Sequence, residues 1–190
     1  MYVLLVRLWH LDYYELMNII SGKYKRRKLL YPKHRQFRPT KSIVREAVFN
    51  IIGPDIEGAS FLDLCSGTGA MGLEAESRGA SKVICVDRDI RFLNQNIELL
   101  KASAQSVRSD AIRYLKTIDS PFDYIYFDPV WADQDAYDQF FEFFSGGGLI
   151  SNQGLLFVEY DKQLDINCFS EFSIVKTSRY GNSSLTIFDF

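Results

Sequence analysis

One stretch of the chain, residues 61–75 with the sequence FLDLCSGTGAMGLEA, restricts the fold more than any other. It opens with a short apolar run that suits a buried strand, turns through Ser66, Gly67 and Gly69, and continues with good helix formers. Because Gly67 and Gly69 have no Cβ, the backbone can turn sharply and a ligand can approach it. A strand, a glycine turn and a helix in this order predict the opening of a nucleotide-binding α/β sheet.

The acid inside the predicted strand distinguishes between the cofactors that use such a turn. Gly67, Gly69 and Gly72 match the dinucleotide pattern GxGxxG, but the carboxylate of Asp63 would repel a pyrophosphate. It suits a cationic ligand instead, such as the ammonium and sulfonium groups of S-adenosylmethionine. The alternative is that Asp63 caps the following turn. We expect S-adenosylmethionine to bind Asp63, Ser66, Gly67, Thr68 and Gly69, and a nicotinamide cofactor is the least expected.

Two further strands are expected to lead into acidic residues. Residues 82–87 end at Asp87, which lies 18 residues after Gly69, near the spacing at which an acid binds ribose hydroxyls. Residues 106–108 lead into Asp110, which we place beside the adenine amine. An acid at either position, or Asp89, could instead cap the helix that follows. The predicted cofactor site therefore also includes Asp87, Arg88, Asp110 and Ala111.

A fourth predicted strand, residues 124–127, leads into Asp128, Pro129, Val130 and Trp131. The carboxylate of Asp128 and the backbone carbonyl of Pro129 can both accept hydrogen bonds from one amino group, and the ring of Trp131 can stack on a base. The alternative is a strand that ends at a proline turn, with Trp131 in the core. We predict that the catalytic residues, acting on a planar amine, are Asp128, Pro129 and Trp131.

Charge is distributed unevenly along the chain, although its formal net charge is only −2. Residues 17–45 contain ten Lys and Arg and no Asp or Glu, interleaved with aromatic residues. This composition is typical of a nucleic-acid-binding surface, although a solvated basic arm without a partner would share it. We expect residues 18–30 to form two short strands about a Ser-Gly turn. The residues predicted to bind RNA are Lys23, Lys25, Arg26, Arg27, Arg38, Lys41 and Arg45.

The remaining pattern completes one α/β domain. Residues 136–145 predict an aromatic core helix, residues 155–160 a fifth strand, and residues 172–177 with 184–188 a terminal antiparallel pair. No apolar run is long enough to span a bilayer, and the three cysteines lack the paired spacing of a metal site. A helix running to about Ile52 is expected to begin at Thr40 or Ser42 as its cap. Its predicted core face is Ile43, Ala47, Val48 and Ile51.

With these motifs identified, the sequence resembles the bacterial 16S rRNA (guanine-N2)-methyltransferase family. The resemblance rests on IISGKYK at 19–25, RPT at 38–40, LDLCSGTG at 62–69, VDRD at 86–89, SDA at 109–111 and DP at 128–129. It implies S-adenosylmethionine as the methyl donor and a guanine exocyclic amine as the acceptor. The family has Asp-Pro-Pro and then Tyr or Phe where this chain has Asp128-Pro129-Val130-Trp131, a departure that bears on rate and base choice.

The resemblance implies an α/β fold with a Rossmann-like seven-stranded class I methyltransferase sheet, a terminal antiparallel pair and a small N-terminal β-hairpin. We expect an N-terminal extension (1–16), a basic RNA-binding hairpin (17–40) and a methyltransferase domain (41–190). The expected activity is methyl transfer to guanine N2 in small-subunit (16S) ribosomal RNA or the assembling subunit, by a cytoplasmic monomer with no membrane or metal partner. The alternatives are an adenine-N6 methyltransferase on DNA or RNA and a non-catalytic RNA-binding assembly factor.

Overall fold

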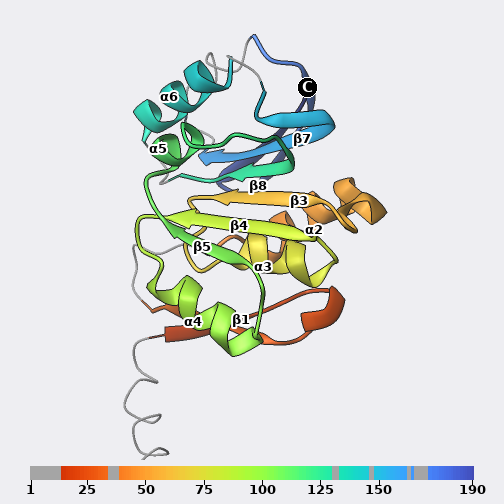
Figure 1. The fold of residues 1–190 in the computed structure, drawn as a ribbon, viewed down its shortest axis with the longest axis vertical. Helices are drawn as coiled ribbons and strands as arrows, with labels where there is room; N and C mark the ends of the chain where they lie inside the picture. The colour runs from red at the N-terminus through yellow and green to blue at the C-terminus, as the bar shows by residue number, and fades with distance from the viewer. Residues whose placement is uncertain (1–13, 34–38, 130–132, 146–147, 162–163, 165–170) are drawn as a thin grey trace, which may run out of the picture.

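The computed structural model describes residues 14–33, 39–129, 133–145, 148–161, 164 and 171–190. They form a seven-stranded sheet with helices on both faces and a separate two-stranded hairpin (Figure 1). The order is β5-β4-β3-β6-β7-β9-β8, and β9 runs antiparallel to both of its neighbours. The sheet strands are β3 (Ser60–Leu64), β4 (Lys82–Asp87), β5 (Gln105–Arg108), β6 (Phe122–Phe127), β7 (Ile150–Asp161), β8 (Ile174–Tyr180) and β9 (Ser183–Asp189).

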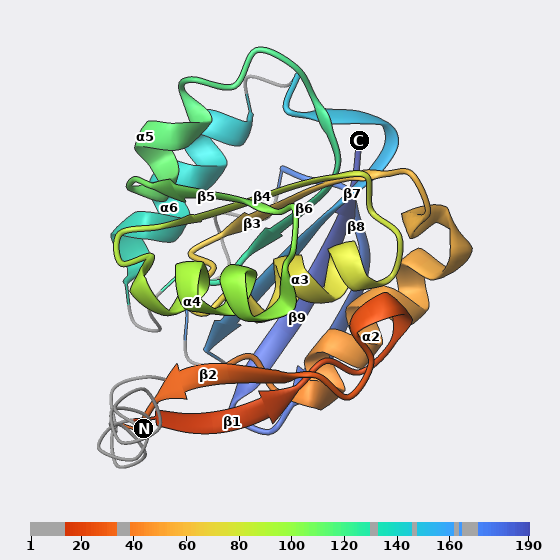
Figure 2. The ribbon, with the colours of Figure 1, turned by 60° about the horizontal axis from the view of Figure 1, so that its bottom comes forward.

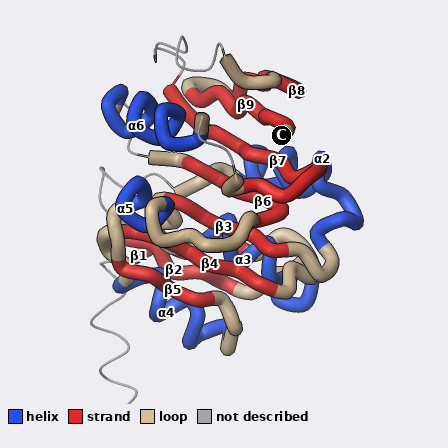
Figure 3. Tube along the Cα trace, turned by 45° about the horizontal axis from the view of Figure 1, so that its top comes forward, coloured by secondary structure: helices blue, strands red, loops and turns tan. Residues whose placement is uncertain are grey.

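The two faces of the sheet carry separate hydrophobic cores (Figure 3). The helices α2 (Ser42–Ile52), α3 (Ala70–Ser77) and α4 (Arg91–Leu100) cover one face, and α5 (Ala111–Leu115) and α6 (Gln134–Phe144) cover the other. The aromatic core helix predicted near residue 140 is α6, and this prediction is confirmed. None of the described helices has the length and apolar composition needed to cross a bilayer. The expected fold class is confirmed.

The connection order places the site. From β3 the chain moves outward through β4 and β5, then returns past β3 to form β6 on its other side. Ligands of such sheets bind at the carboxyl ends of the strands where the winding direction reverses. Here that position lies above the ends of β3 and β6, which pair in parallel through Leu64 and Phe127.

The buried face of α2 differs from the predicted face. Ile43 and Ile51 are 55% and 38% exposed, because the stacking of Phe49 on Phe61 of β3, with ring centroids 5.8 Å apart, fixes the rotation of the helix. The N-cap is Lys41 and makes no side-chain cap bond, so the predicted caps Thr40 and Ser42 were wrong. The buried side chains are Val44, Arg45, Val48, Phe49 and Ile52.

A basic hairpin is present, but the prediction of two short strands about a Ser-Gly turn in residues 18–30 was wrong, because residues 19–27 form the connection between the two strands. Strand β1 (Tyr14–Asn18) pairs antiparallel with β2 (Lys28–Pro32), and the first helical turn η1 (Gly22–Tyr24) lies between them. Residues 14–16, which were assigned to the uncertain extension, pair with Pro32, Tyr31 and Leu30. The sequence of residues 14–16 does not by itself indicate a strand, because this strand is defined by its pairing with residues 30–32. A second such turn, η2 (Gly53–Ile56), follows α2.

The hairpin is fixed to helix α3 by two buried carboxylates. Figure 2 shows the hairpin below α3 and α4, on the side of these helices that faces away from the sheet. Glu74 accepts hydrogen bonds from the backbone N–H groups of Ile20 (2.8 Å) and Ser21 (3.0 Å). Glu76 accepts them from Lys23 Nζ and the Tyr24 hydroxyl, both at 2.9 Å. The hairpin therefore packs as part of the domain rather than as a loose arm.

Candidate active site

The glycine turn connects β3 to α3 through left-handed backbone. Gly67 and Gly69 have φ values of 54° and 78°, a region in which residues with a Cβ are strained. A Cβ on Gly69 would also lie 2.4 Å from Leu93 Cδ1. Cys65, with φ 62°, adopts the same region without being glycine. The strand–turn–helix prediction is therefore confirmed in its geometry.

Asp63 lies beneath this turn with a side chain that is almost fully buried, at 2% exposure. Its Oδ2 accepts a 2.8 Å hydrogen bond from the N–H of Gly72 in the first turn of α3. Burial raises its pKa to about 7, against the lowering effect of the Gly72 hydrogen bond. The structure thus gives Asp63 the turn-holding role that was the alternative in the sequence, and its part in binding a cationic ligand remains a proposal.

Asp87 joins the end of β4 to the same turn. Its Oδ2 accepts from the N–H of Gly67 and its Oδ1 from the N–H of Asp89, both at 2.8 Å. Asp89 in turn accepts from Arg91 N at 3.2 Å, at the start of α4. The N-cap of α4 is Ile90, so neither acid is the predicted cap: Asp89 accepts from the first residue of the helix, and Asp87 holds the glycine turn.

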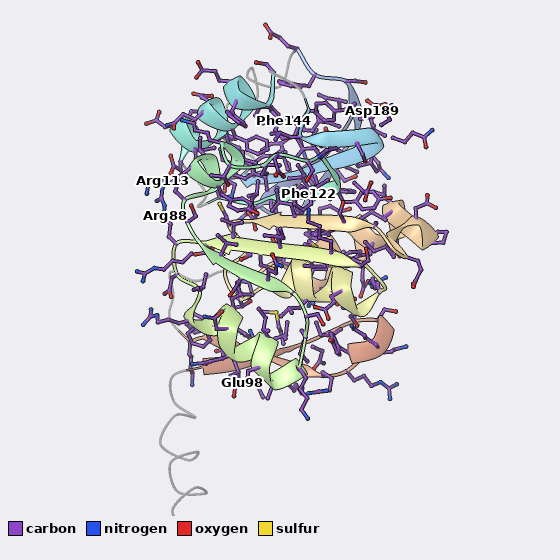
Figure 4. All side chains as sticks on the ribbon, in the orientation of Figure 1. Arg88, Glu98, Arg113, Phe122, Phe144 and Asp189 are labelled. Atoms are coloured by element: carbon purple, nitrogen blue, oxygen red, sulfur yellow. The ribbon has the colours of Figure 1, made fainter. Side chains whose placement is uncertain are left out.

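Asp110 is the N-cap of α5 and accepts a 3.0 Å hydrogen bond from Arg113 N. Its other partner is Arg88, whose Nε and NH2 both donate to Asp110 Oδ2. Figure 4 shows Arg88 and Arg113 at the edge of the sheet where β4 and β5 end. Ala111, the first residue of α5, is buried. Arg88, Asp110 and Ala111 are therefore brought together at one corner of the site.

Asp128 follows β6 directly, and its N–H donates to Leu64 O of β3 at 3.4 Å. Its side chain is half-buried, and Pro129 is buried. On the neighbouring strand, Glu159 accepts a hydrogen bond from the Tyr126 hydroxyl, and its backbone oxygen accepts from Tyr137 Oη at 2.9 Å. These buried contacts support the strand ends on either side of Asp128. Trp131 and Val130 lie outside the described residues.

Four carboxylates converge on the end of β3. Burial, and then the negative charges of Asp87, Asp128, Asp63 and Asp110, raise the pKa of the Cys65 thiol well above its ordinary value. Cys65 therefore stays a neutral thiol and is a poor nucleophile. The four acids come from the ends of β3, β4 and β6 and from the loop after β5, as the sequence predicted. Together they form a strongly negative site that suits a cationic ligand.

The residues of the turn fit S-adenosylmethionine by one direct structural criterion. The hydroxyl Oγ of Ser66 is buried and has no hydrogen-bond partner in the described residues. Buried hydroxyls are rarely left without a partner, so this atom marks a place where a polar ligand completes the bonding. The neighbouring carboxylates add acceptors for ammonium, hydroxyl and amine groups, which are the donors of that cofactor. Thr68 is buried and contributes its backbone.

The predicted RNA-binding cations are placed unequally. Lys23 pairs with Glu76 while 54% exposed, Arg27 donates to Leu99 O, and Lys41 donates to Tyr180 O at 3.0 Å. Lys25 and Arg26 are exposed at the tip of the hairpin, and Arg38 lies outside the described residues. Arg45 is 3% exposed and pairs with the buried Glu74 at 3.5 Å, so it is not a surface cation, and its role in RNA binding stays a prediction.

Sequence reasoning missed Asn96, which links three elements. This fully buried residue of α4 donates through Nδ2 to Thr68 O of the glycine turn and to Leu30 O of β2, each at 3.0 Å, and accepts from Leu30 N at 2.7 Å. The sequence position of Asn96 could have identified it as buried, because this polar residue lies three residues after Leu93 and four before Leu100, on the apolar face of α4. Asn96 therefore couples the hairpin to the cofactor turn.

Comparison with known proteins agrees with this geometry. Residues 17–189 match the family described as "Conserved hypothetical protein 95". The chain is 33% identical over 147 residues to "Ribosomal RNA small subunit methyltransferase D" of Escherichia coli (strain K12), covering 75% of this chain and 74% of that protein. It is 30% identical over 181 residues to "Putative rRNA methyltransferase YlbH" of Bacillus subtilis (strain 168), covering 90% of this chain and 98% of that protein.

A solved structure, "Putative methyltransferase yhhF from Escherichia coli", superposes with a TM-score of 0.78 at 28% identity. It covers 92% of this chain and 97% of that one. The chain therefore belongs to the conserved hypothetical protein 95 family, together with these ribosomal RNA methyltransferase relatives.

Proposed function

We propose that this protein transfers a methyl group from S-adenosylmethionine to the exocyclic N2 amine of a guanine in small-subunit ribosomal RNA, in the cytoplasm. Methylation of ribosomal RNA follows from the family to which the chain belongs. The guanine N2 position is the finer part of the proposal. The observation that supports an exocyclic amine as the acceptor is the pair at the end of β6, formed by the Asp128 carboxylate and the Pro129 carbonyl, beside the glycine turn. The choice of guanine over adenine rests on the resemblance of the sequence to guanine-N2 methyltransferases.

The residues that would hold the cofactor follow from the geometry of the turn. Ser66 and the backbone of residues 67–69 lie at its tip, and we assign the ribose hydroxyls to Asp87, at the end of β4, and the adenine amine to Asp110, after β5. Asp63 adds negative charge beneath them. When bound, S-adenosylmethionine supplies an electrophilic methyl group on a positively charged sulfur.

The chain's own contribution to the reaction is orientation of the amine. The lone pair of a guanine N2 amine is delocalised into the ring, which makes it a weak nucleophile. Hydrogen bonds from its two N–H groups to Asp128 and to the Pro129 carbonyl favour a pyramidal nitrogen and direct its lone pair toward the methyl group. Fixed orientation of this kind lowers the barrier, and the Asp128 carboxylate stabilises the positive charge that develops on nitrogen. The target base must leave its stack to reach this position.

A matched pair of Asp→Asn substitutions tests this role. For Asp128→Asn we expect the single-turnover rate of methyl transfer into unmodified small-subunit ribosomal RNA, or its ribonucleoprotein, to fall about 100-fold or more. The affinity for S-adenosylmethionine, measured by calorimetry, should change less than about threefold. The control is Asp133→Asn, which makes the same charge change at the N-cap of α6, where Asn serves as well as Asp.

The control should keep its rate within about twofold of the parent protein. Equal losses in the two variants would indicate a general charge effect and contradict the clamp. An unchanged rate in Asp128→Asn would remove the carboxylate from catalysis. A protein that binds S-adenosylmethionine but transfers no methyl group to either form of the RNA would support the assembly-factor alternative.

A further inference from the structure

A cavity of about 640 Å³ lies between the hairpin and the first turn of α2. Its size is in the range of pockets that hold small ligands, about 300–1,000 Å³. Four cationic residues line it, and among the described residues of its wall there is no carboxylate. These cations are Lys25, Arg26, Lys41 and Arg45. The cavity is therefore suited to an anion.

The wall contains a buried guanidinium with bonding capacity left over. Arg45 donates through NH1 to Asn18 O at 3.0 Å and lies 3.5 Å from Glu74 Oε2, but its Nε is buried without a partner in the described residues. The charge of Glu74 is already shared, because Arg78 Nε donates to its other oxygen at 2.7 Å. A buried donor without a partner is destabilising, and the residue that carries it lines the cavity.

The start of α2 adds a second feature that favours anions. Its N-cap Lys41 makes no side-chain cap bond, and its first turn carries no acidic residue. The first N–H groups of a helix have no partner within the helix, and its N-terminal end is partially positive. Thr40 and Ser42, which also line the cavity, add hydroxyl donors. Phosphate oxygens are the acceptors that such an arrangement binds well.

One wall of the cavity, the start of α2, lies at the same edge of the sheet as the acid cluster. Lys41 donates to Tyr180 O, and Tyr180 pairs with Ser183 at the turn between β8 and β9. Ser183 in turn pairs with Asp161, the last residue of β7, which runs parallel to β6. The start of α2 therefore lies at the carboxyl edge, where Asp128 follows β6.

An RNA substrate would contact two regions of opposite charge, the acidic active site and the cationic cavity. The acidic residues around Cys65 disfavour phosphate groups, so the active site favours a base over the RNA backbone. The cationic cavity offers the nearby backbone a favourable position on the hairpin side. Because Glu74, Glu76 and Asn96 fix the hairpin to α3 and to the glycine turn, a phosphate bound here is held at a set position relative to the cofactor.

We propose that this cavity binds a phosphodiester group of the RNA strand whose base enters the active site. The proposal rests on the proposed function for its choice of RNA, and it assigns a discrete site where the sequence indicated only a basic segment. Lys25 and Arg26 provide the exposed side of the site. Arg45 and the start of α2 provide its inner wall.

The test compares two double variants with equal changes of charge. Lys25→Gln with Arg26→Asn removes the exposed cations of the cavity, and Asn tolerates the left-handed backbone of Arg26, whose φ is 66°. Lys28→Gln with Lys33→Gln removes two exposed hairpin cations that do not line the cavity. Binding of a fluorescently labelled transcript of small-subunit ribosomal RNA is measured by anisotropy over a range of salt concentrations, without any methyl transfer.

We expect the cavity variant to bind the transcript at least tenfold more weakly at 0.1 M salt. The slope of log Kd against log salt should fall by about 0.7 for each phosphate that the variant no longer binds. The control variant should bind within about threefold of the parent protein. Equal weakening in the two variants would overturn the proposal, because it would indicate a diffuse field rather than a site.

Calorimetry with S-adenosylmethionine tests whether the cavity binds the cofactor instead of RNA. Cofactor affinity in the cavity variant should stay within about twofold of the parent. Weakened cofactor binding with unchanged RNA binding would assign the cavity to the cofactor and overturn the proposal. Cavity-dependent RNA binding by a protein that shows no methyl transfer would support the phosphate site while contradicting the proposed function.

Discussion

The N–H of Gly72 donates a 2.8 Å hydrogen bond to Oδ2 of Asp63, joining the first turn of α3 to the middle of the central strand. This contact lies directly beneath the predicted cofactor turn, and Asp63 is 2% exposed. A buried carboxyl with one backbone donor is only partly compensated for lost hydration, which explains why its pKa rises to about 7. Substitution of either partner should therefore change the stability of the domain.

Asp63→Asn should stabilise the protein at high pH. Because the folded-state pKa, about 7, exceeds the ordinary value of 3.8, the folded state holds its proton more tightly. The free energy of unfolding therefore falls as pH rises from about 4 to 7. Asparagine keeps an acceptor for Gly72 without the charge. At pH 8 the variant should be more stable by a few kcal/mol, since one pKa unit corresponds to about 1.4 kcal/mol.

Urea unfolding of both proteins at pH 5 and pH 8 measures this difference. The gain should be smaller at pH 5 than at pH 8. S-adenosylmethionine should bind the variant more weakly at pH 8, because the negative charge beneath the turn is gone. A variant whose stability parallels that of the parent at both pH values would place the pKa of Asp63 near its ordinary value.

Gly72→Ala should destabilise the protein in spite of the better helix propensity of alanine. A Cβ at this position would lie 2.3 Å from Cys85 Sγ and 3.3 Å from Asp63 Oδ2. Overpacking of this kind costs about 1–3 kcal/mol. Adding Cys85→Ala removes the sulfur, so the double variant should be less destabilised than the sum of the single variants by about 1 kcal/mol or more. Additivity within about 0.3 kcal/mol in urea unfolding would contradict a clash between the new methyl group and the sulfur.

Ser66→Ala should separate cofactor affinity from stability. Since Ser66 Oγ is buried without a partner in the described residues, its removal should change the free energy of unfolding by less than about 0.5 kcal/mol. Loss of one hydrogen bond to the cofactor should weaken S-adenosylmethionine binding about tenfold in calorimetry. Ser81→Ala is the contrasting control, because its hydroxyl donates to Gly58 O far from the turn. It should affect stability and leave cofactor affinity unchanged.

Glu76→Gln should loosen the hairpin in a pH-dependent way. Burial raises the pKa of Glu76, but hydrogen bonds from Ser103 N, Lys23, Tyr24 and Ala104 N outweigh it, and the pKa lies below the ordinary 4.5. The contribution to stability is therefore present above pH 4.5 and is lost as pH falls through the folded-state value. At pH 7 we expect a loss of about 2–3 kcal/mol.

Urea unfolding at pH 7 and pH 3.5 checks this sign. The difference between Glu76→Gln and the parent protein should shrink at the lower pH. A difference that grows as pH falls would mean that the carboxyl is bound in its neutral form, contrary to the four donors that surround it.

The sheet could be predicted from sequence because its signals are local. The strand at residues 82–87 was predicted correctly, and the cap that was the alternative role for Asp110 is present, since a buried strand and a helix N-cap are each determined by a few adjacent residues. The strand at 124–127 was also found, although the pairing of Phe122 with Ile150 of β7 extends it back to Phe122.

The errors concern contacts between distant segments. Arg45 belonged to a basic block, but its environment is set by Glu74, 29 residues away, and by Asn18. The rotation of α2 depends on Phe61, and the start of β1 depends on Pro32. Hydrophobic periodicity indicates none of these partners. In α2 it does not determine the buried face either, because apolar residues lie on more than one side of the helix. The orphaned Ser66 hydroxyl likewise becomes visible only in three dimensions.

The most direct measurement is the identity of the methylated nucleoside. Small-subunit ribosomal RNA lacking the modification, as free RNA and as ribonucleoprotein, is incubated with the protein and tritium-labelled S-adenosylmethionine, then digested and separated by chromatography. We predict that the label elutes as N2-methylguanosine and that Asp128→Ala abolishes it. Label in methyladenosine would contradict guanine as the target base, and label that persists in Asp128→Ala would contradict the amine clamp at Asp128 and Pro129.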